Sequence, residues 1–292
     1  MLGQIKHSLG NNLINIQGWS TSRKILIIES DDWGTIRMPN VRTRNHLISK
    51  YPQQTWSTTY DRVDNLANAT DLSTLFEVLL RYSDKNGRPP VITANTIVGN
   101  PDFEKIKASH YSQYFFEPFT ETLKRYSSHV GTIDLWKEGI RNKVFHPQLH
   151  GREHLNVYKW MAALQNGNAS IREALDYGTW LGLLPDGQRL DVAFDYGQPD
   201  DLPFILNALD DAAAVFEQLF GFKSTSYIAP SYTWNDAIEA KMKEIGVETI
   251  QSGLFQMLPS VELPKRKRRH YIGQDNNCLL YTSPSPRDGL LS

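Results

Sequence analysis

An apolar stretch that ends in two adjacent acids constrains the fold of this chain more than any other feature of its sequence. Residues 25–28 read Ile-Leu-Ile-Ile, and Asp31 and Asp32 follow them before Gly34. Four consecutive apolar residues are typical of a strand covered on both faces, as in a parallel sheet with helices outside. Folds of this kind bind ligands at the carboxyl ends of their strands. We therefore predict a buried strand over residues 24–30 that presents two carboxylates at its end.

A cluster of histidines supplies a second sign of a metal site. Two adjacent carboxylates repel each other, so the pair is favourable only beside a positive group such as a metal ion. His146, His150 and His154 are three of the eight histidines in the chain. If residues 143–150 form a strand, His150 lies at its far end, and Gly151 permits a turn into a predicted helix that has His154 in its first turn. Two such imidazoles and a carboxylate from another strand end could hold one ion.

His146 competes with His154 as the partner of His150, because each is four residues away from it. Along a strand, four residues span roughly 13 Å, which is too far for two ligands of one ion. This favours His154. A strand that ended at His146 would reverse the preference, so His146 stays as the alternative ligand.

These residues resemble the polysaccharide deacetylases with a NodB-homology domain, also called carbohydrate esterase family 4. The family's first motif is a strand that ends in two Asp residues and a Gly, which Asp31 and Asp32 match with Trp33 inserted before the Gly. Its second motif is His, a small residue, two variable residues and His, which residues 150–154 match. Its third motif is Arg-any-Pro-aromatic; the chain keeps Pro230 and has an aromatic residue, Tyr232, one position later than the motif, but Ile228 stands where the Arg would be. The resemblance covers roughly residues 20–255 and is greatest to a bacterial subgroup of the family.

The resemblance implies a reaction and roles for four side chains. Asp31 would be the catalytic base, and Asp32, His150 and His154 would bind a divalent metal, with Zn²⁺ as the first choice. The ion would polarise an acetyl carbonyl and activate a water molecule. The chain would then remove acetyl groups, N-acetyl before O-acetyl, from a carbohydrate substrate.

Further residues near these motifs are candidates for substrate contact. Asn95 ends the next predicted strand, where polar groups can face the same cavity. The faces of Trp33 and Trp234 are suited to stacking on sugar rings. The predicted substrate-binding residues are Trp33, Asn95, Pro230, Tyr232 and Trp234.

Two other functions use the same residues. Ile228 in place of an Arg makes a catalytically inactive carbohydrate-binding protein of the same fold an alternative. A metal-dependent esterase or amidase that acts on a small molecule is the other.

Alternation of strand and helix patterns predicts an α/β fold with a mainly parallel sheet. The resemblance narrows this to a distorted (β/α) barrel of the NodB-homology type. The predicted strands are 24–30, 91–98, 143–150, 191–195, 224–229 and 247–251, and the predicted helices are 71–83, 115–126, 155–165, 201–220 and 235–245. The polar segment 45–68 is predicted to be a long loop beside the site.

The end of the chain reads differently from the rest. A nucleotide sequence that resembles a sequencing-library adapter encodes residues 278–288, so we expect 278–292 to be a non-native tail. Residues 1–277 would then form a single catalytic domain that is incomplete at its C-terminus. The family's Leu-x-His motif, which carries the general acid, would be missing, and this chain would be weakly active or inactive.

Composition excludes several classes of function. A formal net charge of −1 predicts no broad attraction to nucleic acid or to an anionic membrane. Cys278 is the only cysteine, so we expect neither a disulfide nor a thiolate metal site. No apolar run approaches the roughly 18 residues of a membrane span, and residues 1–18 lack the apolar core of a signal peptide. The cytoplasm is the expected compartment.

Overall fold

The computed structural model describes residues 21–52, 64–180, 182–271, 273–275 and 279–282. Five strands form a curled, parallel half-barrel in the order β1 (Ile28–Trp33), β2 (Ile92–Ile97), β5 (Phe145–Gly151), β6 (Ser226–Ile228) and β7 (Thr249–Gln251), and β10 (Leu280–Thr282) pairs with β7. Over these described residues, the pairing runs from β1 at one edge to β10 at the other and does not join the two edges. The prediction of an α/β fold with a parallel sheet is confirmed, whereas a closed barrel is not shown.

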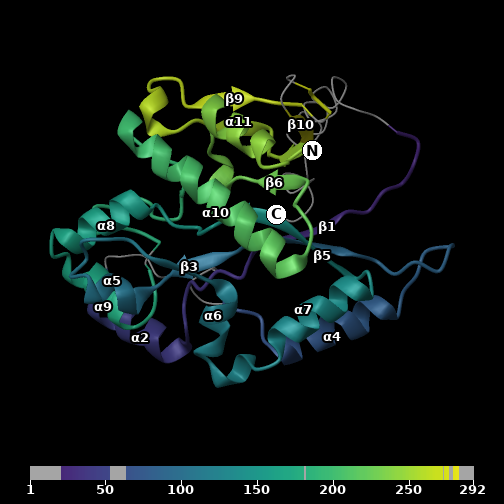
Figure 1. Ribbon diagram of the computed structural model, residues 1–292, viewed down its shortest axis with the longest axis horizontal. Coiled ribbons are helices and arrows are strands. Elements are labelled where there is room, and N and C mark those ends of the chain that lie inside the picture. The colour runs from purple at the N-terminus through teal and green to yellow at the C-terminus, as the bar shows by residue number, and fades with distance from the viewer. Residues whose placement is uncertain (1–20, 53–63, 181, 272, 276–278, 283–292) are drawn as a thin grey trace, which may run out of the picture.

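Helices surround this sheet in three groups (Figure 1). α4 (Ala69–Leu80) and α7 (Thr132–Arg141) lie side by side, and α10 (Leu202–Phe220) packs on α11 (Asp236–Glu244). The third group contains α8 (Val157–Gln165) and α9 (Ala169–Asp176), together with α2 (Val41–Lys50) and α5 (Phe103–Ala108).

Short elements complete the described structure. α6 (Phe119–Lys124) follows a small antiparallel pair, β3 (Gly99–Pro101) with β4 (Phe116–Pro118), and β8 (Phe255–Met257) pairs with β9 (Lys267–Arg269). Single 3₁₀ turns lie at Ser127–His129, Pro199–Asp201, Pro230–Tyr232 and Ser260–Glu262. No helix in the described ranges has both the length and the apolar character that a membrane crossing would need.

An aromatic cluster fixes the first strands of the sheet to the helices behind them. The ring of Trp33 on β1 lies 4.9 Å from Phe145 on β5 and 5.8 Å from Trp136 on α7, between ring centroids. Trp136 and Phe145 are almost fully buried. Burial of large rings in edge-to-face contact is among the strongest packing contributions available to a core. This cluster therefore holds β1 in place just beyond its two acids.

The sheet curls enough for side chains of distant strands to meet on its other face. Asn95 of β2 donates a hydrogen bond to Gln251 of β7 over 3.3 Å, although β5 and β6 lie between these strands. In a flat sheet, strands three positions apart would be about 14 Å from each other. The hydrogen bond thus shows that the concave face of the half-barrel closes around polar side chains.

Prediction of the first strand was wrong at its start. β1 begins at Ile28, and the side chains of Ile25, Leu26 and Ile27 are 50%, 85% and 65% exposed. β1 is the edge strand of the sheet, with β2 as its neighbour, and the exposed apolar residues precede its first paired residue, Ile28. β1 also ends later than predicted, at Trp33, so Asp31 and Asp32 lie inside the last part of the strand instead of beyond its end.

Two further predicted elements have to be corrected. Residues 191–195 form turns and bends in place of the predicted strand. The predicted helix 115–126 is divided into β4 and α6 at Pro118. Proline lacks an amide hydrogen and fits only at the start of a helix, so α6 begins directly after it.

Four helices were not predicted from the sequence. They are α2, α5, α7 and α9, and α2 overlaps the first part of the predicted loop 45–68. Residues 53–63 of that loop lie outside the described residues, as do Cys278 and residues 283–292. The non-native origin of the tail therefore remains a prediction. The strands predicted at 91–98, 143–150, 224–229 and 247–251 and the helices predicted at 71–83, 155–165, 201–220 and 235–245 are confirmed within a few residues.

Candidate metal centre

A bulge in β1 separates the roles of its two acids. Ser30 pairs with Ala94 and Trp33 pairs with Thr96, so Asp31 and Asp32 together lie opposite a single residue of β2, Asn95. Asp32 takes up the extra residue with a φ of 66°, in the left-handed region. In a regular strand, neighbouring side chains point to opposite faces. Here the bulge re-aims them, so that Asp31 meets Asn95 while Asp32 turns toward β5.

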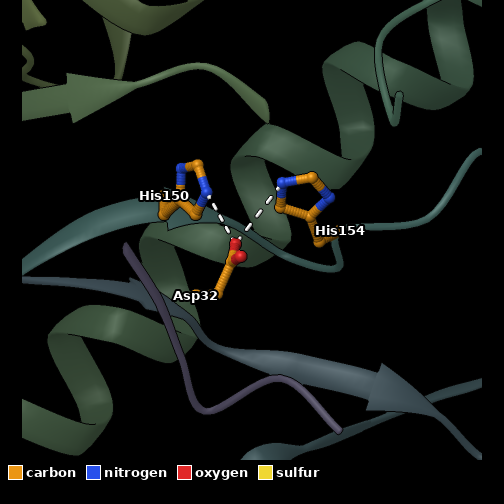
Figure 2. Close-up of side chains that lie close together, drawn as sticks. All are labelled: Asp32, His150 and His154. Atoms are coloured by element: carbon orange, nitrogen blue, oxygen red, sulfur yellow. Dashed lines mark hydrogen bonds and ion pairs between the residues drawn. The ribbon is translucent and has the colours of Figure 1, made fainter. Parts of the chain in front are cut away.

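Asp32 meets two imidazoles at the end of β5 (Figure 2). Its Oδ1 lies 3.1 Å from Nε2 of His150 and 3.4 Å from Nε2 of His154. His150 is in the last part of β5, and His154 lies in the connection to α8, three residues before the helix begins rather than in its first turn. Both imidazoles are buried, at 3% and 5% exposure. One potential ligand atom from each of the three residues lies within 4.8 Å of the others.

These distances fit a shared metal ion. With bonds of about 2.0–2.1 Å at tetrahedral angles, ligand atoms lie about 3.3 Å apart. Nδ1 of His150 donates a hydrogen bond of 2.7 Å to the main-chain carbonyl of Ile228, which directs Nε2 toward Asp32. Metal-binding histidines are commonly fixed in this way through their second nitrogen. Asp32, His150 and His154 could therefore hold a divalent ion.

Arg37 is a member of the site that the sequence reasoning missed. Its Nη2 lies 2.8 Å from Oδ2 of Asp32, and its Nε lies 2.6 Å from Oδ2 of Asp64. Burial by itself would raise the pKa of Asp32, but His154, the hydrogen bond from His150 and the charge of Arg37 hold it far below its usual value. Asp32 is thus an anion at any physiological pH. Its Oδ2 is engaged by Arg37, and its Oδ1 faces the two imidazoles.

The two imidazoles differ in their affinity for a proton. Burial lowers the pKa of His154 to about 4, in spite of the nearby Asp32 carboxylate. Burial also opposes protonation of His150, but the hydrogen bond and the charge of Asp32 prevail and raise the pKa of His150 above its ordinary value. Without metal, His150 therefore keeps its proton to a higher pH than His154, with the Asp32 carboxylate as its partner.

Metal binding should release this proton. An imidazole can bind a metal ion only through an unprotonated nitrogen, so Zn²⁺ must displace the proton from His150. We expect Zn²⁺ affinity to increase with pH until His150 is deprotonated in the metal-free protein. Calorimetric titration at pH 6.5 in buffers of different ionisation enthalpy should show a net release of protons on binding of the ion. Binding without proton release at that pH would contradict the assigned protonation.

His146 lies away from the three ligands. Its Nε2 is 2.8 Å from Nε2 of Gln148, and its ring stacks on Phe222 with centroids 5.6 Å apart. The geometry therefore favours His154 over His146 as the partner of His150.

Substitution of these histidines gives a direct check. His146→Leu should leave the Zn²⁺ dissociation constant within about twofold of the wild-type value, whereas His154→Leu should weaken binding about 100-fold or more, as expected for the loss of one of few ligands. Titration with Zn²⁺ against a chromophoric chelator measures both. Equal losses in the two variants would contradict the ligand assignment.

The structure places the predicted substrate-binding residues in different environments. Trp234 is fully buried, donates from Nε1 to Glu239 over 3.1 Å and stacks on His270, so its assignment to the wall of a carbohydrate cleft was wrong. The sequence signal, an aromatic residue near a motif, does not distinguish a core ring from an exposed one. Asn95 is fully buried as well and bonds to Asp31.

Pro230 and Tyr232 belong to a tight turn after β6. Ser231 and Tyr232 both have positive φ angles, 53° and 54°. The N–H of Tyr232 donates to the carbonyl of Ala229 over 2.9 Å, so it is engaged within the turn. Strained turns of this kind are often found at functional sites. In this turn, however, the Tyr232 amide already donates to a carbonyl of the turn itself.

Trp33 borders a cavity beside the end of β1. The cavity has a volume of about 180 Å³. Asp31, Asp32 and Asp64 contribute to its lining, and Trp33, Phe119 and Trp136 form apolar parts of its wall. Trp33 thus lies close to the acids, although its ring also packs in the core.

Comparisons with known proteins give distant likenesses of structure. No protein-family model matches the sequence, and no curated protein matches it. The structure is similar to a polysaccharide deacetylase from Bacillus cereus, with a TM-score of 0.37 and 9% identity, over 89% of this chain and 64% of that one. A de-N-acetylase from Aggregatibacter actinomycetemcomitans has a TM-score of 0.32 and 12% identity, over 88% and 90% of the two chains.

A 4-α-glucanotransferase and an α-amylase occur among the similar structures too. The α-amylase AmyC from Thermotoga maritima has a TM-score of 0.39 and 6% identity, over 91% of this chain and 47% of that one. This chain spans less than two thirds of the length of the Bacillus deacetylase and about half that of the amylase. Because deacetylases and amylases both occur, these likenesses do not choose a reaction, and the function proposed below is inferred from the chain's own side chains.

Proposed function

We propose that this protein is a metal-dependent hydrolase that removes acetyl groups from a glycan. The observation that carries the proposal is the grouping of Asp32, His150 and His154 around one point, with a second carboxylate, Asp31, next to them in the chain. Three protein ligands that leave a position open are typical of catalytic metal sites. The acetylated glycan as substrate comes from the likeness of these residues to the deacetylase motifs.

The chain supplies two carboxylates with separate tasks. A divalent ion such as Zn²⁺ at the three ligands would polarise an acyl carbonyl and make water nucleophilic at neutral pH. Asp32 is bound by Arg37 and faces both imidazoles, so it serves as a ligand and is unsuited to accept a proton. Asp31 is held by Asn95 instead of by the imidazoles or the arginine, and we assign it the role of general base.

Metal removal tests the proposal. The protein is first treated with dipicolinate and then given back one equivalent of Zn²⁺. Acetate release is measured from chitopentaose, from acetylated xylan and from p-nitrophenyl acetate, whose leaving group needs no protonation. We expect acetate release from at least one of them to disappear with the chelator and to return with the metal, because the open coordination position is needed for activation of water.

Absence of acetate release from all three substrates at full metal loading would contradict a hydrolytic function. Activity on p-nitrophenyl acetate without activity on the two glycans would favour the small-molecule esterase or amidase.

A carbohydrate-binding protein without catalysis is a second candidate. The observation in its favour is Ile228, which occupies the motif position of an Arg and is 4% exposed. Calorimetric binding of chitopentaose by the Zn²⁺-loaded protein, without acetate release during a long incubation, would favour this candidate over the enzyme.

A further inference from the structure

Asn95 lies behind the proposed base and is itself inaccessible. Its side chain is 0% exposed, so it cannot contact a glycan, and the substrate-binding role predicted for it was wrong. Its Nδ2 donates to Oδ1 of Asp31 over 2.8 Å and to Oε1 of Gln251 over 3.3 Å. An amide nitrogen carries two hydrogens, and both are directed at oxygen acceptors. Rotation of the amide by 180° would put an oxygen against two oxygens, so the orientation is fixed.

Gln251 is oriented in turn by the polar face of the half-barrel. Its Nε2 donates to Oγ of Ser226 over 3.4 Å, and that hydroxyl is 3.0 Å from Oε1 of Gln148, to which it donates. The main-chain N–H of Ser226 donates to the same oxygen of Gln148 over 2.9 Å. In this series of hydrogen bonds each donor faces an acceptor, and the series runs from Gln148 on β5 through Ser226 on β6 and Gln251 on β7 to Asn95 on β2. The carbonyl oxygen of Gln251 is therefore left to face Asn95.

We propose that Asn95, oriented by Gln251, is a positioning residue that holds the Asp31 carboxylate for proton transfer. The inference rests on the proposed function of Asp31 as general base. Asp31 lies in a bulge at the end of an edge strand, where the backbone alone does not fix the direction of a short side chain. A hydrogen bond from a buried amide fixes one carboxylate oxygen and leaves the other for the reacting water. Because Asn95 does not contact Asp32, His150 or His154 through a hydrogen bond in the described structure, its effect on the metal should be small.

The variants for the test are chosen to separate an effect on the position of the Asp31 carboxylate from an effect on the stability of the protein. Asn95→Leu removes both donors at a similar volume, and Asn95→Asp keeps the shape but places an acceptor against Asp31. Gln256→Leu is the matched control, because Gln256 is also 0% exposed, and among the described residues its side chain bonds to Trp234 and His270, outside the series of hydrogen bonds that leads to Asp31. Each variant is loaded with Zn²⁺, and metal content, melting temperature, kcat and KM are measured with the best of the three acetylated substrates.

We expect Asn95→Leu to lower kcat about 10- to 100-fold, the effect of a misplaced reacting group, with KM and metal content within about twofold of wild type. Asn95→Asp should lower kcat by a similar factor, and Gln256→Leu should keep the wild-type kcat. In an Asp31→Ala background, Asn95→Leu should cause no further loss, because a residue that acts through Asp31 has nothing left to position. An equal further loss in that background, or a loss of metal, would overturn the inference.

A structural readout covers the case in which no substrate is turned over. In crystals of the Zn²⁺-loaded proteins, we expect the Asp31 carboxylate to keep its hydrogen bond to Asn95 in the wild type and to adopt another rotamer in Asn95→Leu. An unmoved Asp31 in the variant would overturn the positioning role by itself. Lack of turnover with a displaced Asp31 would instead count against the proposed function alone. If Asn95→Leu fails to fold, the isosteric Asn95→Asp provides the same comparison.

Discussion

Replacement of Asp32 by Ala is expected to weaken Zn²⁺ binding about 100- to 1,000-fold, which amounts to loss of the metal under ordinary conditions. Structural zinc sites bind with about 10–16 kcal/mol, and an equal share for each of four ligands gives a loss of this size. Asp32 also neutralises charge, since its carboxylate faces Arg37 and both imidazoles. Its removal would leave the Arg37 guanidinium beside the metal position without its carboxylate partner, so the effect should not be smaller than the share of one ligand.

Metal content after dialysis and competition against a chromophoric chelator measure this effect. Asp211→Ala is a suitable control, because Asp211 is an acid on α10 that pairs with Arg152 and not with the site. If Asp32→Ala retained one tightly bound Zn²⁺, the assignment of the metal centre would be refuted.

Replacement of Asp31 by Ala should have the opposite pattern, with metal retained and turnover lost. General bases contribute about 10²- to 10⁴-fold to rates, so kcat should fall by that factor. The Zn²⁺ dissociation constant should change little, because the hydrogen bond of Asp31 goes to Asn95 and not to the imidazoles. Asp32 would then control the affinity for Zn²⁺, and Asp31 would control kcat.

Parallel measurement of metal content and kcat in the two variants decides the division of roles. Equal metal content together with full activity in both Asp31→Ala and Asp32→Ala would contradict it. Loss of metal in both would indicate instead that the pair acts as a single ligand unit.

The sequence was sufficient to predict which candidate ligands meet, because these residues lie near strand ends. His150 and Asp32 come at or near the carboxyl ends of strands in one parallel sheet, and such ends meet at one edge. The spacing argument that favoured His154 over His146 relied only on the length of an extended chain, and the grouping of Asp32, His150 and His154 agrees with it. The residues that support the ligands were harder to predict. Arg37 and Gln251 act through contacts across 5 and 156 residues of sequence, and neither lies in a recognisable motif.

The errors in the predicted elements have physical causes. The run Ile25–Ile28 is as apolar as an interior strand, but within the described residues only Ile28 of this run pairs with β2, and pairing partners cannot be read from composition. The second half of α2 was assigned to the predicted loop 45–68 because that segment is polar, and only Thr43 and Leu47 of the helix are buried. Trp234 shows the same difficulty for single residues, since tertiary packing decides whether a ring is a wall or part of the core.

The position of Asp32 on an edge strand links the metal to the mechanical integrity of the sheet. β2 lies between β1 and β5, so an ion held by Asp32, His150 and His154 would bridge across β2 and fasten the outermost strand to the middle of the molecule. Edge strands are where local fraying begins, and a ligand that binds only the intact arrangement suppresses it. Removal of the ion should therefore speed amide hydrogen exchange in β1 before the rest of the sheet. Asp31 would move with β1 and lose its register with Asn95 of β2.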